Sequence, residues 1–535
     1  MAKLINIWLA CLGMISFEIQ HKDLLARIGK FKTKSGIIET PAFLPVVNPA
    51  KKIVTPKELW ENFNCKALIT NAYIVKKHFS EEAIEKGIHK ILEFPGVVMT
   101  DSGAYQILTY GDVEVTNEEI IKYQEKINTD IATILDLPTG WRVSLEHAKY
   151  TVEETFRRAK NLETLKSRRD IAWVGPIQGG CYIDLVRTSA KKMGSLPFDI
   201  HALGSPTPIM EQYLFSTLVD MVIAAKMNIP VNRPFHLFGA GHPFMFSLVI
   251  ALGCDLFDSA AYSLFAREDR YLTAYGTIRL EELDYLPCSC QVCVKREPKE
   301  LREMPKNERE RELSKHNLYV CFAEIKRIKQ AIIEGRLWEY MEMRAHSHPS
   351  LLQALKRIQK YSKYIEKNSP CIKRKGLFFF GSTGLMRPEV IRHFERLKKR
   401  YIPPRWAKVL LLIPDSETKK IRRRKHLKRT IQRICRKLSL DINSIHACFY
   451  SPPFGVIPVE LSETFPLFQY EYAYPPDENT VDYIVQRILE YIADKSYTTV
   501  IILTGRDQWN KNVADLCIKK SSEFKIKSEM LILGI

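Results

Sequence analysis

The feature that most constrains the fold is an alternation of short apolar, β-branched-rich runs with segments of helical spacing through the first half of the chain. This alternation is typical of parallel strands joined by crossover helices. The predicted strands are 41–47, 67–70, 96–100, 131–135, 171–177, 200–203, 235–238 and 254–257. Eight strand–helix units over about 260 residues have the count and length of a (β/α)8 TIM barrel. A doubly wound open sheet remains an alternative, because a local sequence pattern does not determine the order of the strands in the sheet.

Amphipathic stretches fill the segments between the predicted strands. Two of them open on Ser80 and Thr116, which are residue types that cap helix N-termini. After residue 283 a cysteine cluster interrupts the rhythm, and a helical tail follows with the sequence HNLYVCFAEIKRIKQAIIEGRLWEYMEMRA. We expect this tail to complete the outer helical ring of the barrel.

The length of the chain predicts more than one domain. At 535 residues it exceeds the roughly 250 to 300 residues at which a single core stops growing. We predict an α/β chain with a barrel domain over residues 1–346, which includes an inserted subdomain at about 283–320, then a helical linker over 347–372. The strand patterns GLFFF, AKVLLLI, TTVIIL and EMLIL predict a C-terminal α/β sandwich domain over 373–535.

The charge of the chain is strongly basic. Lys and Arg number 80 against 61 Asp and Glu, a net charge of +19, which favours a polyanionic partner such as nucleic acid or an acidic membrane face. Eleven of the basic residues lie between Lys419 and Lys437. They predict either a phosphate-binding surface or a solvated helix face.

The sequence favours a cytoplasmic location. No apolar stretch reaches the roughly 18 to 20 residues that span a bilayer. The start, MAKLINIWLACLGMI, faintly imitates a signal peptide but has no clean cleavage site, so we expect Met14 to be the true first residue. Twelve cysteines in 535 residues are too sparse for a disulfide scaffold.

Carboxylates, an amide and glycines close six of the predicted strands, where a barrel builds its active site. They are Asp101, Asp136, Gln178, Gly204, Gly239 and Asp258. A single aspartate in such a place usually caps the next helix, but three at one rim favour a functional site. Glycines let backbone N–H groups approach a flat ligand, and Tyr105 and Phe238 are candidates to stack on its faces, although a single aromatic residue is more often part of the core.

Two carboxylates that face each other across an N-glycosidic bond support a retaining displacement. One attacks the anomeric carbon, and the other protonates the departing base and later accepts a proton from the incoming one. This chemistry needs no redox cofactor, and no convincing phosphate-binding loop or dinucleotide fingerprint occurs in the sequence.

A metal site is predicted from the spacing of three cysteines and a histidine. Cys288, Cys290 and Cys293 are followed after 22 residues by His316. Three thiolates and an imidazole form a closed tetrahedral set, which is typical of structural zinc and leaves no vacant position for catalysis. A coincidental cluster is the alternative.

These motifs together resemble the tRNA-guanine transglycosylase family over roughly residues 15 to 345. The resemblance rests on TDSGAYQ, LDLPTG, IQGG, ALGS, HLFGAGHP and DLFDSAAY, with YLPCSCQVC followed by HNL. The sequences HLFGAGHP, DLFDSAAY and YLPCSCQVC followed by HNL are similar to the archaeosine branch of the family. That branch exchanges guanine at position 15, in the D-loop of tRNA, for 7-cyano-7-deazaguanine.

The resemblance also implies roles for individual residues. Asp258 would be the nucleophile that forms the ribosyl-enzyme ester, and Asp101 the general acid and base. The implied substrate-binding residues are Ser102, Tyr105, Asp136, Gln178, Gly204, Phe238 and Gly239, and the implied metal is one structural Zn²⁺ on Cys288, Cys290, Cys293 and His316. The implied partners are tRNA, guanine, 7-cyano-7-deazaguanine and a second copy of the chain, with no membrane.

Two departures from the family pattern stand out. The loop after Gly204 reads Ser-Pro-Thr-Pro, and no PUA module is recognised before the end of the chain at EMLILGI. The region SPPFGVIPVELSETFPLFQYEYAYPP instead resembles a domain shared with archaeosine synthases. Three alternatives therefore stay open: a queuosine-type enzyme acting on the anticodon, a synthase-like paralogue, and a non-catalytic tRNA-binding paralogue.

Overall fold

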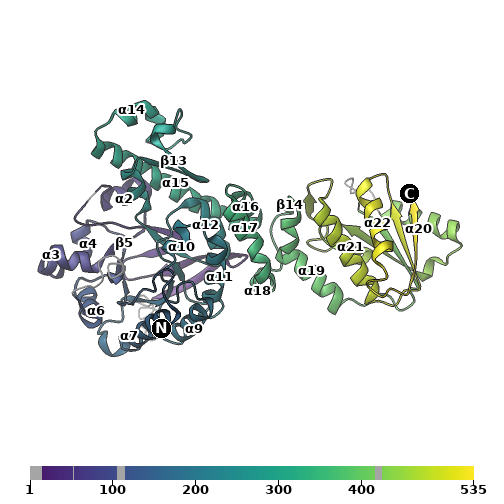
Figure 1. Cartoon of the computed structure of the whole chain (residues 1–535), viewed down its shortest axis with the longest axis horizontal. Coiled ribbons are helices and arrows are strands. Elements are labelled where there is room, and N and C mark those ends of the chain that lie inside the picture. Colours follow the sequence, from purple (N-terminus) through teal and green to yellow (C-terminus); the bar gives the residue numbers. More distant parts are fainter. Residues whose placement is uncertain (1–14, 52, 105–114, 416–423, 535) are drawn as a thin grey trace, which may run out of the picture. The chain divides into compact units, whose positions relative to one another are not determined.

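The computed structural model describes residues 15–51, 53–104, 115–415 and 424–534, so Met14 lies outside the described residues. The chain forms two compact units that divide between Ile358 and Gln359 (Figure 1). No helix within the described ranges is long and apolar enough to cross a membrane.

Eight parallel strands form the sheet of the first unit. They are β4 (Ala42–Pro45), β5 (Ala67–Asn71), β6 (Val97–Asp101), β7 (Ile131–Thr133), β8 (Ala172–Ile177), β9 (Ile200–Leu203), β10 (Phe235–Leu237) and β11 (Leu256–Ser259). Their order is β4-β11-β10-β9-β8-β7-β6-β5. The two ends of the sheet meet where Val46 bridges Ile69 and the N–H of Val47 donates to the carbonyl of Ile69 at 2.8 Å. The sheet is therefore a nearly closed barrel, as predicted, and the open-sheet alternative is wrong.

Helices surround this barrel, as Figure 1 shows. They include α2 (Pro56–Phe63), α3 (Ala72–Lys86), α4 (Ile88–Leu92), α6 (Asn117–Lys126), α7 (Leu145–Lys160), α8 (Leu162–Leu165), α9 (Ile183–Gly194), α10 (Thr207–Glu211), α11 (Phe215–Lys226), α12 (Phe246–Ala251) and α13 (Ala261–Arg267). Thr116 caps α6 in a reciprocal capping box with Glu119, as predicted. Helix α3 begins after its N-cap Asn71 and is divided by a kink at Ser80, whose backbone is non-helical, so a second helical segment follows Ser80 as predicted.

The end of the barrel opposite the predicted rim is covered by a sheet that the sequence pattern did not predict. It is antiparallel and consists of β1 (Ser16–Asp23), β2 (Ala26–Lys32) and β3 (Ile37–Thr40). Phe31 and Ile38 of this sheet are buried against residues at the starts of the barrel strands, among them Ala67 and Val97. The small sheet therefore packs against the N-terminal end of the barrel, opposite the rim that holds the predicted site residues.

The remaining elements of the first unit follow β11. They are β12 (Arg270–Thr273), β13 (Gly276–Arg279), α14 (Pro298–Glu303), α15 (Lys306–Glu334), α16 (Leu337–Ala345) and α17 (Pro349–Arg357). In Figure 1 the segment that carries β13 and α14 stands out from the ring of helices. Helices α15 and α16 hold the tail sequence expected to complete that ring.

The second unit is built on a mixed five-stranded sheet. Its strands are β15 (Val409–Pro414), β16 (Ile445–Ser451), β17 (Gly455–Pro458), β19 (Thr499–Thr504) and β20 (Glu529–Gly534), in the order β17-β16-β15-β19-β20. Only β17 is antiparallel to its neighbour. A short parallel pair, β14 (Leu377–Phe379) with β18 (Tyr470–Tyr472), accompanies it.

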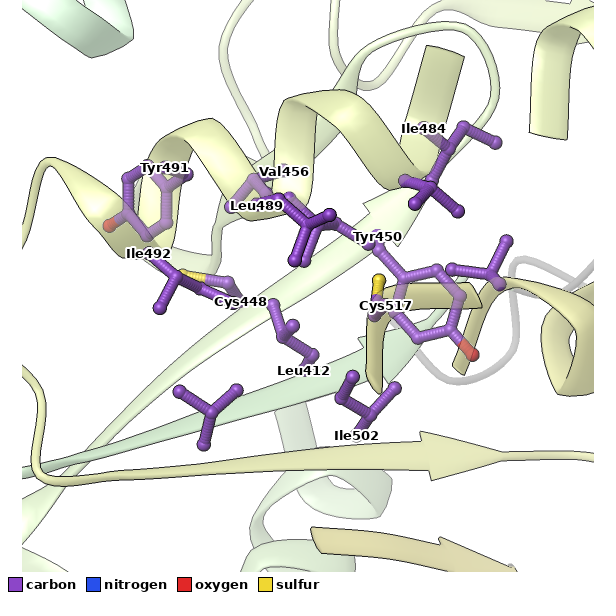
Figure 2. Close-up of a cluster of buried hydrophobic side chains, with 14 of the residues drawn as sticks. Leu412, Cys448, Tyr450, Val456, Ile484, Leu489, Tyr491, Ile492, Ile502 and Cys517 are labelled. Carbon is purple, nitrogen blue, oxygen red and sulfur yellow. The ribbon is translucent and has the colours of Figure 1, made fainter. Parts of the chain in front are cut away.

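Each face of this sheet buries a separate hydrophobic cluster, which gives the three layers of the predicted sandwich. The helices of the unit are α18 (Ser362–Asn368), α19 (Pro388–Lys399), α20 (Arg424–Leu438), α21 (Glu478–Ala493) and α22 (Gln508–Lys520). Figure 2 shows side chains of α21, such as Ile484 and Leu489, directed at Leu412 and Ile502 of the sheet. Leu427 and Ile434 of α20 belong to the cluster on the other face.

Candidate active site

Three aspartates lie at the C-terminal rim of the barrel. Asp101 is the last residue of β6, Asp258 lies near the end of β11, and Asp136 follows β7. Burial raises the pKa of Asp101 to about 7, and the negative charges of Asp136 and Asp258 add to this shift. Asp136 and Asp258 therefore lie close enough to Asp101 to act on its carboxyl group. A carboxyl group with a pKa near 7 is suited to both donating and accepting protons at neutral pH.

The carboxylate of Asp101 is held by neighbouring groups on one oxygen. Its Oδ2 accepts from the side-chain amide of Asn71 at 3.1 Å and from the N–H of Gly103 at 3.3 Å. Asn71 is the last residue of β5, directly beside Asp101 in the strand register. The register of two adjacent strands therefore fixes the position of this acid.

Asp258 is oriented by a histidine that the sequence analysis missed. The Nε2 of His236 lies 2.8 Å from Oδ1 of Asp258, and the N–H of Gly239 donates to the same oxygen at 3.2 Å. His236 is fully buried, whereas the side chain of Asp258 is 13% exposed. Within the described part of the chain both of these hydrogen bonds reach Oδ1, and none reaches Oδ2 of Asp258.

A period-two pattern on β10 could have identified His236. His236 and Phe238 are two residues apart and so lie on the same face of an extended chain. Their ring centroids are 4.7 Å apart, and Phe238 packs against the hydrophobic cluster that fills the barrel. His236 lies one pleat before Phe238 and does not close its strand, so the pattern of strand-end residues does not include it.

Asp136 and Gln178 form the polar centre of the rim. The side-chain amide of Gln178 donates to Oδ2 of Asp136, and its carbonyl accepts from the N–H of Thr139 at 2.9 Å and the hydroxyl of Ser205 at 3.0 Å. Burial raises the pKa of Asp136 to about 6, while the bond from Gln178 opposes this rise. The pair thus presents a fixed donor and acceptor pattern in a buried position.

Two of the predicted glycines have no room for a side chain. A Cβ on Gly204 would lie 2.3 Å from the side-chain nitrogen of Gln178. Gly239 has a φ of +71°, and a Cβ there would lie 2.4 Å from the hydroxyl of Thr207. Any larger residue would displace a neighbour that shapes the rim.

Ser102 and Tyr105 are the remaining predicted contact residues, and the structure describes only Ser102. Ser102 is fully buried beside Asp101, and its hydroxyl has no partner among the described residues. Tyr105 lies outside the described residues. Of the two aromatic rings predicted to stack on the ligand, the structure therefore describes only that of Phe238.

The predicted metal ligands meet in one cluster that could hold a metal ion. The ligand atoms of Cys288, Cys290, Cys293 and His316 all lie within 4.8 Å of one another. Nδ1 of His316 is 3.5 Å from Sγ of Cys290 and 3.3 Å from Sγ of Cys293. Ligands bound at about 2.0 to 2.3 Å in a tetrahedron lie roughly 3.5 to 3.8 Å apart, so the spacing fits one small ion.

The surroundings of this cluster prepare His316 for coordination. Its Nε2 lies 2.9 Å from the carbonyl of Leu272, which fixes the proton on that nitrogen and leaves Nδ1 toward the sulfurs. Tyr271 stacks on the imidazole at 3.6 Å and its hydroxyl lies 3.3 Å from Sγ of Cys293. The hydrophobic core of the segment is small, so a metal ion would add a substantial part of its stability.

The positive charge of the chain is concentrated in the second unit. Residues 359–535 contain 33 Lys and Arg against 18 Asp and Glu, which is +15, whereas residues 1–358 contain 47 against 43, which is +4. On α20 the side chains of Lys428, Arg429 and Arg433 are exposed, while Leu427 and Ile434 are buried. This unit has the charge expected of a surface that contacts a polyanion.

Comparison with protein families gives two matches. Residues 22–350 match the family described as queuine tRNA-ribosyltransferase, and residues 390–529 match a domain of unknown function. The first match covers the barrel strands, the rim residues and the cysteine cluster.

Curated relatives cover most of the chain. A tRNA-guanine(15) transglycosylase of Sulfolobus acidocaldarius is 42% identical over 492 residues, which is 91% of this chain and 95% of the relative. One from Saccharolobus solfataricus is 42% identical over 92% of this chain and 97% of the relative. One from Methanocaldococcus jannaschii is 45% identical over 85% of this chain and 68% of the relative.

Proposed function

The chain belongs to the queuine tRNA-ribosyltransferase family, and from this premise we propose that it exchanges guanine at position 15 of tRNA for 7-cyano-7-deazaguanine. It is thus a pentosyltransferase of the archaeosine type. The observation that carries this assignment is the similarity to tRNA-guanine(15) transglycosylases along nearly their whole length, second unit included.

We assign the two half-reactions to Asp258 and Asp101. Oδ2 of Asp258 attacks C1′ of the ribose, the C1′–N9 bond breaks, and the departing guanine takes a proton from Asp101. The incoming base then attacks C1′ through its own N9, gives its proton to Asp101 and releases the carboxylate of Asp258. Two displacements at one carbon retain its configuration, and no oxidant or reductant is needed.

We assign recognition of the base to the rim residues around these acids. Asp136 and Gln178 offer hydrogen bonds to the edge of a purine-like ring, and Gly204 leaves Gln178 in place. Gly239 presents its N–H to Asp258, and Ser102 offers a buried hydroxyl beside Asp101. Phe238, and Tyr105 by the resemblance of its motif, would stack on the faces of the ring.

The function is tested by incubating purified full-length protein with unmodified tRNA and labelled 7-cyano-7-deazaguanine. Nuclease digestion and mass spectrometry then locate the label. Label at position 15 is the expected result. Label in the anticodon would indicate a queuosine-type enzyme. Conversion of a nitrile already present in tRNA would indicate a synthase-like paralogue, and tRNA binding without incorporation a non-catalytic one.

We propose that the ion held by Cys288, Cys290, Cys293 and His316 is a structural Zn²⁺. Three thiolates with one imidazole are the preferred set for zinc, and four protein ligands leave no open position for substrate. When bound, the ion cross-links the segment after β13 to α15 and supplies no catalytic chemistry.

We also propose that the second unit is a tRNA-binding accessory domain, and that the enzyme is a cytoplasmic homodimer. The excess positive charge of residues 359–535 supports the first proposal.

The proposal of a dimer rests on the family resemblance, and light scattering on the purified protein would measure the oligomeric state.

The raised pKa of Asp101 predicts the pH dependence of the first half-reaction. Only protonated Asp101 can protonate the leaving guanine, so formation of the ribosyl-enzyme should fall about tenfold per pH unit above pH 7. Rapid-quench single-turnover assays at saturating tRNA would measure this fall in rate between about pH 7 and pH 9. In Asp136→Asn, which lacks the neighbouring negative charge, the midpoint should move to lower pH.

A stability measurement checks the same pKa without substrate. The folded protein disfavours the ionised form of Asp101. This residue therefore does not lower the free energy of unfolding below pH 3.8, the ordinary pKa of an aspartate, and it lowers that free energy increasingly as the pH rises toward 7. Asp101→Asn should therefore raise the Tm more at pH 8 than at pH 4. Equal shifts at both pH values would contradict a raised pKa.

His236 is expected to act as a positioning residue for Asp258. His236→Phe removes the hydrogen bond to Oδ1, so kcat should fall by about 10- to 100-fold while KM for tRNA stays unchanged. His236→Gln, which keeps a donor, should recover part of the loss. A lower Tm together with unchanged kcat would indicate a purely structural role.

A further inference from the structure

A cavity of about 320 Å³ lies in the second unit. It is bounded by α19, by the chain around Cys371 and by the loop that follows β17. Apolar side chains make up much of its wall: Leu397, Leu461, Phe465, Pro466 and Leu467. Its volume is at the lower end of the roughly 300 to 1,000 Å³ found for small-ligand sites, which suits a single ring system.

Three arginines spaced by one helical turn line the same cavity. Arg392, Arg396 and Arg400 follow one another at intervals of four residues along α19 and its C-terminal end, and so share one side of it. Arg392 is buried and committed to the fold, because its guanidinium binds Glu366 at 2.6 Å and the carbonyl of Pro370 at 2.9 Å. Arg396 and Arg400 are exposed, and the described residues include no ion-pair partner for either.

Among the described residues that line the cavity, the one negative charge is compensated by ion pairs. Glu389 is the one carboxylate among the described residues of its lining, and it pairs with Lys373 at 2.9 Å and with Arg387 at 3.4 Å. The side chain of His393 is a donor to the carbonyl of Val456 at 2.8 Å, and burial lowers its pKa to about 4. An apolar recess therefore has two uncommitted guanidinium groups beside it and lies in a unit of net charge +15.

We propose that this cavity binds one unpaired nucleotide of the tRNA substrate, with the base in the apolar recess and its flanking phosphates on Arg396 and Arg400. Unpaired RNA is recognised through bases that leave the stack and enter apolar or aromatic pockets, while Arg side chains contact the backbone. Phe465 and Tyr401 supply aromatic surface in the lining. The inference rests on the proposed function for the identity of the RNA, and it adds a tRNA contact in the second unit to the contacts proposed at the barrel rim.

The test compares tRNA affinities of full-length variants by fluorescence anisotropy, in an Asp258→Asn background so that covalent chemistry does not contribute. Arg396→Gln with Arg400→Gln removes the two charges. Thr464→Trp fills the cavity from an exposed position in its lining and leaves the charge unchanged. Lys398→Gln with Lys399→Gln is the matched control, because it removes two exposed charges from α19 that do not line the cavity.

Both cavity variants should weaken tRNA binding by about 10-fold or more, and the control by no more than about 2-fold. The arginine double variant should also lose roughly 1.4 from the slope of log affinity against log salt, as expected for two single-strand phosphate contacts. With Asp258 restored, kcat at saturating tRNA should be unchanged in every variant.

Wild-type affinity in Thr464→Trp would overturn the proposal, since a filled cavity could not then receive a base. An equal loss in the control would also overturn it and leave only a diffuse electrostatic attraction. Strong binding of a free mononucleotide with no change in tRNA affinity would reassign the cavity to a small metabolite. Cavity-dependent RNA binding without base exchange would leave this inference intact and refute the proposed function.

Discussion

Replacing Asp258 by asparagine is expected to lower base exchange by at least about 10⁴-fold and to abolish the covalent tRNA adduct. Asparagine keeps the shape of the side chain and an oxygen that can accept from His236 and Gly239. Asparagine lacks the second carboxylate oxygen, Oδ2, which accepts no hydrogen bond from the described residues. The loss should therefore appear in kcat, with little change in the affinity for tRNA.

The adduct can be measured directly. Protein and tRNA are mixed without a free base, quenched in detergent and separated on a denaturing gel. Asp101→Asn is the informative comparison, because it should slow adduct formation by about 10² to 10⁴ without removing the nucleophile. Asp184→Asn, whose side chain is 92% exposed on α9, controls for the substitution itself. An adduct in Asp258→Asn at the wild-type level would exclude Asp258 as the nucleophile and make Asp101 the first alternative.

Removing a ligand from the cysteine cluster is expected to give the largest loss of stability. Cys290→Ser should release about one equivalent of zinc per chain and lower the free energy of unfolding of this segment by several kcal/mol. The reason is the small core of the segment, in which Cys293 is itself one of the buried residues. Mass spectrometry of the metal and limited proteolysis between residues 283 and 320 would measure both effects.

Cys321→Ala provides the matched control. Cys321 is buried on α15, the helix that carries His316, and its thiol donates to the carbonyl of Gly241 rather than joining the cluster. This variant should keep its full zinc content. A Cys290→Ser protein that also keeps a full equivalent of zinc would contradict the proposed ligand set, and a different metal in the wild-type protein would contradict its identity.

Much of the molecule follows from local sequence patterns. The eight strand–helix repeats predicted the barrel because each strand of a parallel sheet is a continuous apolar run and each crossover helix has its own spacing. The same logic placed Asp101, Asp136 and Asp258 at one rim, since the ends of parallel strands share one edge. The spacing of Cys288, Cys290 and Cys293 predicted the cluster because short loops bring such ligands together.

Other features were decided by contacts between residues far apart in the chain. The sheet β1–β3 does not follow from the barrel pattern, because its strands pair with each other, whereas the strands of the barrel alternate with helices. The hydrogen bond between His236 and Asp258 depends on the register of β10 against β11. The cavity beside Arg396 and Arg400 depends on a loop some sixty residues later packing against α19.

The sequence by itself thus determined the periodic elements, the residues at the strand ends and the metal-ligand spacing, because each of these is set by neighbours along the chain. Only the tertiary structure decided that the sheet closes between Val46 and Ile69, that His236 holds Asp258, and that two arginines of α19 lie beside an apolar recess. The physical reason is that strand register and side-chain partners are selected by packing across the fold, and local periodicity carries no information about which distant surfaces meet.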